Sequence, residues 1–383
     1  MTPRFASHFD LGTAIWLNTA HQGALPSRAA AATRLAIEWK MRPAALTSDR
    51  FAAVPSRLRC ALGELIGAPD DQIMLANSAS YGLQVLAEAW PWQAGDEVLV
   101  SATDFPSDIL PWLTLESRFG VRVRRVMPTG AVISPDELSE AITASTRLFC
   151  TSWVHSFTGH AVDLDALGEI CRARGVTFVV NASQAIGARD LQVGDHPIDA
   201  MTSVGFKWLC GPYGTGFCWL SPEVLQRLRR TRAYWLSMLT ADDLAGDLGE
   251  LKIGPIQSAI DLDVFGTANF FNFTALAAAV ELHLELGPAA ISTHDQALVE
   301  ALVAASEDHG LRLISPREPS FKRSTLVLVG HEDKARLHRL GQALLRADVH
   351  IAVRGGAIRF APHLYNSIEQ VELVRAVLAD VPC

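Results

Sequence analysis

The residue in this chain best suited to covalent chemistry is Lys207, which lies between a serine-glycine turn and glycines at positions 211, 214 and 216. The other residues from 203 to 217 are mostly apolar or aromatic, so we expect little water around the amine. Burial lowers the pKa of a lysine, and a neutral amine is the form that condenses with an aldehyde. An ordinary surface lysine beside a turn also fits this pattern. The glycines favour chemistry, because they let backbone approach a ligand closely.

A second stretch with chemical potential runs from 77 to 82, between a short apolar strand at 73–76 and a helix that continues to about Trp90. It contains Ser78, Ala79 and Ser80. Small hydroxyl residues at a helix start lie beside free backbone N–H groups and the positive end of the helix dipole, an arrangement that binds phosphate. A serine that only caps the helix is the alternative explanation.

Polar side chains also follow other predicted strands. Asn181 and Gln184 come directly after the apolar strand 177–180. Ligands of open α/β sheets bind beyond the carboxyl ends of the strands, so these two side chains are candidates for a site. Asn18 and His21 lie in a polar turn within residues 15–26, which either lines the same site or is a capped loop.

The elements that must position these residues alternate between strand and helix. Strands near 73–76, 97–100, 121–123, 147–150, 177–180 and 199–204 are separated by helical patterns such as 51–67, 135–143 and 164–174. This order predicts a parallel sheet covered on both faces. The strand at 199–204 leads to Lys207, and residues 215–220 should return antiparallel beside it.

The C-terminal third has a different pattern. An alanine-rich helix that opens at Gly266-Thr267 and ends at Gly287-Pro288 should join two domains. Helices at about 294–309, 333–347 and 367–379 then surround strands at 325–329, 349–353 and 357–361, which predicts a compact α+β domain. Residues 229–263 are less regular and are expected to form a surface loop or arm.

Composition narrows the function. The chain has 383 residues, 49% of them hydrophobic, and 33 basic against 41 acidic residues, for a net charge of -8. We therefore expect no binding to nucleic acid or to anionic membranes. The N-terminus lacks a signal-peptide pattern and no long apolar run occurs, so a cytoplasmic location is expected. Six cysteines without a Cys-x-x-Cys pair and scattered histidines argue against disulfides and against a metal site.

Together, these motifs resemble the class V aminotransferase family of fold type I pyridoxal-phosphate enzymes, which includes isopenicillin N epimerase, cysteine desulfurase, selenocysteine lyase and kynureninase. The likeness runs from Leu17 to Asn366 and is most specific at Gly-Phe-Lys-Trp-Leu-Cys-Gly-Pro-Tyr-Gly-Thr-Gly-Phe, 205–217. It implies an α/β fold with a large, mainly parallel sheet domain at 26–265. Residues 1–25 and 266–383 would form the small α+β domain. The implied cofactor is pyridoxal 5'-phosphate.

The resemblance also implies roles for individual residues. Lys207 would bind the cofactor as an imine and carry the proton at the substrate α-carbon. The remaining cofactor contacts would be Ser78, Ala79 and Ser80 at the phosphate, Phe105 on the ring face, Gln184 and Ser156 near the phenolic oxygen, and Asn181 at the ring nitrogen. Thr267 would reach the phosphate of a partner subunit, in a homodimer with shared sites. Arg359, assisted by Arg354, would bind the carboxylate of an amino acid substrate, and Asn18 and His21 would lie near the rest of it.

Three departures from the family pattern bear on the reaction. Asn181 replaces an aspartate that keeps the ring nitrogen protonated, and a neutral amide weakens carbanion stabilisation by about one or two powers of ten. The loop at 354–359 has no cysteine, so a desulfurase that forms a persulfide there is not expected. Phe206 replaces the histidine that precedes the lysine in desulfurases, as in the epimerase-like branch.

These observations predict an enzyme that acts at the α-carbon of an amino acid as an epimerase, a lyase or a transaminase. The alternative from another class is a protein that binds the cofactor but works as a sensor or partner-binding module, because Asn181 weakens catalysis.

Overall fold

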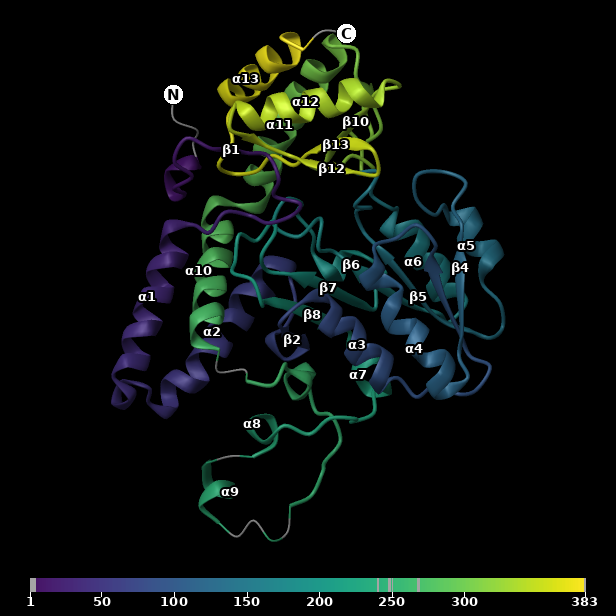
Figure 1. Ribbon diagram of the computed structural model, residues 1–383. Coiled ribbons are helices and arrows are strands. Elements are labelled where there is room, and N and C mark those ends of the chain that lie inside the picture. The colour runs from purple at the N-terminus through teal and green to yellow at the C-terminus, as the bar shows by residue number, and fades with distance from the viewer. Residues whose placement is uncertain (1–4, 240, 247–248, 250, 267–268, 382–383) are drawn as a thin grey trace.

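The large sheet of this protein has seven strands, all parallel except one (Figure 1). The computed structural model describes residues 5–239, 241–246, 249, 251–266 and 269–381. The strand order is β2 (Ile73–Ala76), β8 (Gly216–Leu220), β7 (Ala200–Val204), β6 (Thr177–Asn181), β5 (Thr146–Ser152), β3 (Glu97–Ser101) and β4 (Arg122–Val126). Strand β8 runs antiparallel to both of its neighbours, as predicted for the segment after Lys207. The α/β fold expected from the sequence is confirmed.

Helices cover the sheet, and the side chains of its strands are therefore mostly buried. The edge strand β4 is the exception, since its side chains are half-buried or exposed. The helices of this region are α1 (Ser27–Met41), α2 (Ser48–Ile66), α3 (Ala79–Ala89), α4 (Leu110–Phe119), α5 (Pro135–Ala141), α6 (Leu164–Ala173), α7 (Pro222–Arg227) and α10 (Phe270–Leu286). Two hydrophobic clusters lie along the sheet, one around Phe149 and Phe178 and the other around Trp112 and Val98. The sheet is thus held between two layers of apolar side chains.

The second, smaller sheet lies at the opposite end of the molecule from the arm and has the order β12 (Ala352–Arg354), β13 (Ala357–Phe360), β10 (Val327–Gly330) and β9 (Arg312–Leu313). Helices α11 (Pro288–Asp308), α12 (Lys334–Arg346) and α13 (Ile368–Ala379) pack with it around a third cluster. The N-terminal strand β1 (Ile15–Trp16) pairs in parallel with β11 (Val349–His350). The beginning of the chain is therefore attached to its C-terminal part.

The boundary between helices α10 and α11 differs from the one predicted. The sequence predicted a helix beginning near residue 294, but α11 begins at Pro288. Proline lacks only an N–H that the first helical turn leaves unpaired, so it can open a helix as well as stop one.

Among the described residues, no single helix is long and apolar enough to cross a membrane. Helices α10 and α11 pass that test only as a pair, which bends by 83°.

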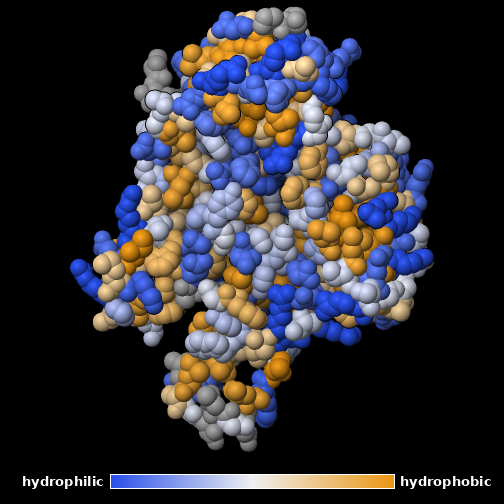
Figure 2. Space-filling view, viewed as in Figure 1, coloured by the Kyte–Doolittle hydropathy of each residue, from blue (hydrophilic) through white to orange (hydrophobic). Residues whose placement is uncertain are grey.

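After α7 the chain leaves the large sheet domain as a projecting arm, which carries the short helices α8 (Trp235–Met238) and α9 (Ala241–Ala245) (Figure 1). The end of the irregular stretch predicted at 229–263 returns to the core, where Ala259 and Leu262 are buried. Hydrophobic side chains gather on it in Figure 2. The exposed apolar residues of the arm are Trp235, Leu236, Leu244, Leu251, Ile253 and Ile260. An arm with this much exposed apolar surface is typical of a protein interface.

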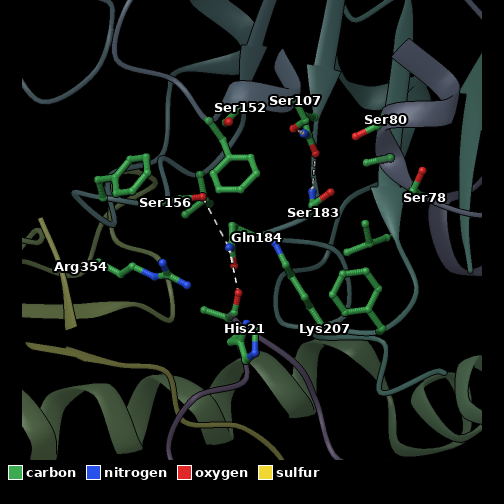
Figure 3. A pocket seen from close by; sticks show the side chains of 18 of the residues that line it. His21, Ser78, Ser80, Ser107, Ser152, Ser156, Ser183, Gln184, Lys207 and Arg354 are labelled. Atoms are coloured by element: carbon green, nitrogen blue, oxygen red, sulfur yellow. Dashed lines mark hydrogen bonds between the residues drawn. The ribbon is translucent and has the colours of Figure 1, made fainter. Parts of the chain in front are cut away.

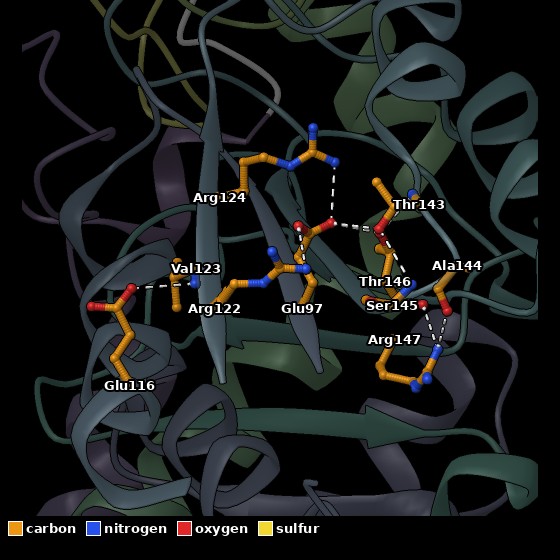
Figure 4. A network of polar contacts seen from close by, with 10 residues as sticks. All are labelled: Glu97, Glu116, Arg122, Val123, Arg124, Thr143, Ala144, Ser145, Thr146 and Arg147. Carbon is orange, nitrogen blue, oxygen red and sulfur yellow. Dashed lines mark hydrogen bonds and ion pairs between the residues drawn. The ribbon is translucent and has the colours of Figure 1, made fainter. Parts of the chain in front are cut away.

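The edge of the large sheet is held by a buried acid, Glu97 (Figure 4). Its carboxylate accepts hydrogen bonds from Arg124 of the edge strand β4, at 3.1 Å, and from Thr146, at 2.7 Å. Burial raises the pKa of Glu97, but these donors outweigh it and the net pKa is lowered. The arginines of β4 also keep this open edge from pairing with other strands.

Candidate active site

A cavity of about 310 Å³ lies where the carboxyl ends of the large sheet meet the small domain (Figure 3). The predicted site residues that line it are His21, Ser78, Ala79, Ser80, Phe105, Ser156, Asn181, Gln184, Lys207, Arg354 and Arg359. Residues that line it without having been predicted include Ser107, Ser152, Val154, Phe157, Ser183, Val204, Phe206 and Tyr213. The fold thus brings together side chains from segments more than 300 residues apart in sequence.

Two predicted residues are not among the lining residues. Asn18 is buried and forms a β-bridge with Ala361, so a direct contact between Asn18 and a substrate does not follow from this structure. The turn that contains it nevertheless places His21 in the cavity. Thr267 lies outside the described residues.

Lys207 enters the cavity from a tight loop that follows β7. The backbone of this loop is fixed by hydrogen bonds from Gly211 N to Gly205 O, at 2.8 Å, and from Gly23 N to Phe206 O, also at 2.8 Å. A Cβ atom at Gly205 would collide with Thr215 and Leu276. Glycine is required there because the loop and the returning strand β8 lie so close together.

Two buried histidines hold the loop from behind. The carbonyl oxygen of Trp208 lies 2.8 Å from Nε2 of His283 and 2.9 Å from Nε2 of His363. His363 also contacts the carboxylate of Asp295 at 2.8 Å. Burial lowers the pKa of His363, but Asp295 more than compensates and raises it to about 10. A charged pair in the core therefore fixes the residue next to Lys207.

Cys210 lies in the same buried group as His283 and His363. The nitrogen atoms of both histidines face carbonyl or carboxylate oxygens. Burial lowers the pKa of His283 to about 4, so this histidine is neutral and donates to only one of its two carbonyl neighbours. The thiol of Cys210 is fully buried.

The pKa of Lys207 falls to about 8, from an ordinary value of 10.5. Burial is the largest cause, and the positive charges of Arg359 and Arg354 add to it, while Asp108 opposes them. The amine also lies 5.8 Å from the centre of the Phe105 ring. A considerable fraction of Lys207 is therefore neutral near pH 8, as covalent chemistry requires.

The N-terminus of α3 forms one wall of the cavity. Ser78 caps this helix by accepting a hydrogen bond from Tyr81 N at 3.2 Å, so part of the capping alternative is correct. Ser80 lies one residue inside the helix and is exposed to the cavity. A Cβ atom at Gly216 would lie 2.7 Å from Ser203 O and 3.0 Å from the carbonyl carbon of Ser78. Strand β8 thus supports the helix start closely, and free N–H groups remain for an anion.

Asn181 ends β6 beside Ser152, the last residue of β5. Its side-chain oxygen accepts a hydrogen bond from Ser183 N at 3.0 Å, and its side-chain nitrogen donates to Asp108 at 2.5 Å. Asp108 also accepts from the hydroxyl of Ser152 at 2.7 Å. Burial and the neighbouring Asp104 raise the pKa of Asp108 to about 7. Sequence reasoning did not find this acid, although two acids four residues apart, Asp104 and Asp108, soon after strand β3 are a visible signal.

Gln184 is held by three partners. Its oxygen accepts from the indole N–H of Trp208 at 3.1 Å, which turns its nitrogen toward Ala20 O, at 3.1 Å, and the Ser156 hydroxyl, at 3.4 Å. One of the two N–H groups of the amide is therefore held only by a long contact with Ser156, which also lines the cavity (Figure 3). Such a donor suits a phenolate oxygen.

The small domain contributes two arginines. Arg359 on β13 is buried, and the only hydrogen bond of its guanidinium group among the described residues is a long one, 3.4 Å, to Ser156 O. Its Nε atom has no partner there. Burial and Arg354 lower the pKa of Arg359 to about 10, so it remains charged at neutral pH. The pKa of His21 is lowered by burial and by these two arginines. Buried guanidinium groups with unused donors are expected to bind an anion.

The residues present fit pyridoxal phosphate. The cavity has a helix N-terminus for a phosphate, an amine of lowered pKa for the aldehyde, and unused buried polar atoms, including Ser183 Oγ and Arg359 Nε. Aromatic side chains supply a wall for a flat ring. The constellation defines a site for an aldehyde cofactor that carries a phosphate and for a substrate that carries a carboxylate.

Residues 42–379 match the family model described as aminotransferase class-V, and the chain belongs to this family of pyridoxal-phosphate-dependent enzymes. It is 26% identical to isopenicillin N epimerase of Streptomyces clavuligerus, over 94% of this chain and 93% of that one. It is also 26% identical to a probable cysteine desulfurase of Methanothermobacter thermautotrophicus, over 82% of this chain and 80% of the other.

Solved structures show the same fold. A complex of the cystine C–S lyase C-DES with its reaction product, cysteine persulfide, superimposes with a TM-score of 0.87 at 22% identity and covers 97% of this chain and 99% of that one. The apo cysteine desulfurase of Thermococcus onnurineus has a TM-score of 0.85 at 18% identity, over 99% and 98% of the two chains. Relatives with different reactions share this scaffold, so the reaction must be argued from the site itself.

Proposed function

We propose that this protein acts at the α-carbon of an amino acid, with Lys207 as the group that carries the proton. The observation that supports this most directly is the position of the Lys207 amine, with its lowered pKa, in one cavity with the buried cation Arg359. When bound, pyridoxal phosphate makes the Cα–H bond of an amino acid acidic by withdrawing electrons from it. Lys207 would accept that proton, and Arg359 would hold the carboxylate by a bidentate contact. The reaction type is that of an epimerase, a lyase or a transaminase.

Transfer of sulfur through a cysteine persulfide on the small domain is not part of this proposal. The loop between β12 and β13 consists of Gly355 and Gly356 and has no thiol. The described cysteines are buried except Cys60, which lies on α2, and Cys60 does not line the cavity. A lyase that releases its sulfur product into solution would remain compatible with this site.

The test is a comparison of the wild type with Lys207→Ala. The variant should lose the absorbance of the lysine-linked cofactor together with racemisation, elimination and transamination over a panel of amino acids. Lys207→Ala protein that retains both would refute the proposal. A wild type that binds the cofactor but turns over none of the amino acids would favour the alternative of a sensor or binding module.

The same proposal includes a homodimer with shared sites, located in the cytoplasm. The exposed apolar side chains of the arm support an interface, since Leu251 and Ile253 are 62% and 71% exposed in the single chain. We expect Leu251→Ser/Ile253→Ser protein to be smaller than the wild type in analytical ultracentrifugation. Phe119→Ser, at an exposed site on α4, is the matched control. A monomeric wild type would contradict this part.

A further inference from the structure

The orientation of the Asn181 side chain is settled by its neighbours. The backbone N–H of Ser183 lies 3.0 Å from the side-chain oxygen of Asn181, and a backbone N–H can only donate. The amide nitrogen must therefore be the atom that faces Asp108, at 2.5 Å. Because the Ser183 contact alone fixes this orientation, it does not depend on whether Asp108 carries a proton.

Asp108 is arranged to receive hydrogen bonds. One of its oxygens accepts from Asn181 and the other from the Ser152 hydroxyl at 2.7 Å. The carboxyl group of Asp108 is fully buried and does not line the cavity. Ser107, Ser152 and Asn181 lie between it and the cavity, which they line. Asp108 is thus a positioning residue: it contacts the lining residues Asn181, Ser152 and Ser107, and its charge also raises the pKa of Lys207.

The second hydrogen of the Asn181 amide has only a weak partner. Its best acceptor among the described residues is the hydroxyl of Ser107, at 3.4 Å. Asn181 therefore offers the cavity a donor, and its acceptor is occupied by Ser183. The aspartate that the family has at this position would offer an acceptor. A ring nitrogen opposite an N–H donor is stable as an unprotonated acceptor, whereas one opposite a carboxylate is stable with its proton.

We propose that Asn181, oriented by Ser183 and Asp108, donates a hydrogen bond to the ring nitrogen of the cofactor and keeps that nitrogen unprotonated, so that the site favours β-elimination over racemisation and transamination. This inference rests on the proposed function and narrows it to one reaction type. The substrate is an amino acid with a good leaving group, such as a thiolate or a halide, on its β-carbon.

The chemical reason lies in where the electron pair goes. In racemisation and transamination the pair of the broken Cα–H bond must be held by the cofactor ring, which an unprotonated nitrogen makes harder. In β-elimination the electron pair of the broken Cα–H bond becomes the second bond between Cα and Cβ. The leaving group departs with the electron pair of its own bond to Cβ. Lys207 carries the proton from Cα to the leaving group, so the step is balanced without an oxidant or a reductant.

The test is the ¹⁵N NMR shift of the holoprotein loaded with cofactor labelled at the ring nitrogen, which separates the protonated from the unprotonated form without turnover. We expect the unprotonated signal in the wild type. The matched variant is the exchange Asn181→Asp/Asp108→Asn, which keeps the composition and charge but turns a carboxylate to the cavity; it should give the protonated signal. A protonated signal in the wild type would overturn the proposal while leaving the proposed function intact. Absence of lysine-linked cofactor would overturn both.

Activity supplies the second readout. The probes are β-chloro-L-alanine, which has a leaving group, and L-alanine, which differs by having hydrogen in its place. We expect the wild type to eliminate chloride at least about 100-fold faster than it exchanges the α-hydrogen of alanine in D₂O. The exchange variant should raise alanine exchange about 10- to 100-fold. Equal rates on the two probes in the wild type would overturn the preference for elimination.

Discussion

Replacing Arg359 by glutamine should raise the pKa of Lys207, because Arg359 is the strongest of the charges that lower it. With a pKa of about 8, about a quarter of the Lys207 amines are neutral at pH 7.5, against about one in a thousand for a lysine of ordinary pKa. The fold therefore increases the reactive form roughly 200-fold. If the substitution raises the pKa by about one, the neutral fraction at pH 7.5 falls to about 3%.

The assay is the rate at which the cofactor-free protein reacts with a lysine-selective acylating reagent, followed by mass spectrometry of the Lys207 peptide from pH 6 to 11. The exposed Lys40 in the same digest gives the reference profile. Arg354→Gln is the matched control, since Arg354 is exposed and contributes less than Arg359. A wild-type midpoint above 10, or a larger change in Arg354→Gln than in Arg359→Gln, would refute the electrostatic reasoning.

Two further predictions concern the support of the site. Asp295→Asn removes the partner of a buried charged histidine and should lower the free energy of unfolding in urea by about 3–5 kcal/mol. The control is Asp308→Asn, which removes the partner of an exposed ion pair with Arg375 and should lower the free energy of unfolding by less than about 1 kcal/mol. Similar losses in the two variants would contradict the role of the buried Asp295–His363 pair. The stabilisation by the Asp295–His363 pair is present near pH 6.5 and is lost as the pH rises through about 10, because the folded pKa of His363 is raised. Gly216→Ala should weaken cofactor binding, measured by equilibrium dialysis, because the added Cβ atom forces β8 away from the start of α3. The control is Gly194→Ala, which has open space around it and should keep the wild-type affinity. Equal affinities of the two variants would show that the close contact at Gly216 is not needed.

Most of the scaffold could be predicted because local pattern and global fold agree. The glycines around Lys207 are needed where strand, loop and helix meet within van der Waals distance, and that need is visible in sequence. The start of α11 was misplaced because Gly287-Pro288 both ends one helix and opens the next. Such a boundary cannot be assigned from the dipeptide alone.

Asp108 was missed for a different reason. Its role depends on the register that places Ser152 beside Asn181 at the ends of two neighbouring strands, and on a turn that brings Asp108 behind both. None of these relations is local in sequence. The family resemblance implied an acid at position 181, where this chain has Asn181. The structure shows an acid, Asp108, behind Asn181 and a backbone donor that fixes the orientation of its amide.

With the proposed roles of Arg359 and Lys207, the charges of the cavity would couple substrate binding to the base. Arg359 lowers the pKa of Lys207, and the carboxylate of a bound amino acid would neutralise much of the charge of Arg359. In the absence of substrate, the low pKa keeps the amine neutral and available for the aldehyde; once the carboxylate is bound, the same amine becomes a stronger base for the α-proton. Arg359 can therefore serve both imine formation and proton abstraction, because it lowers the pKa of Lys207 only until the substrate carboxylate binds to Arg359.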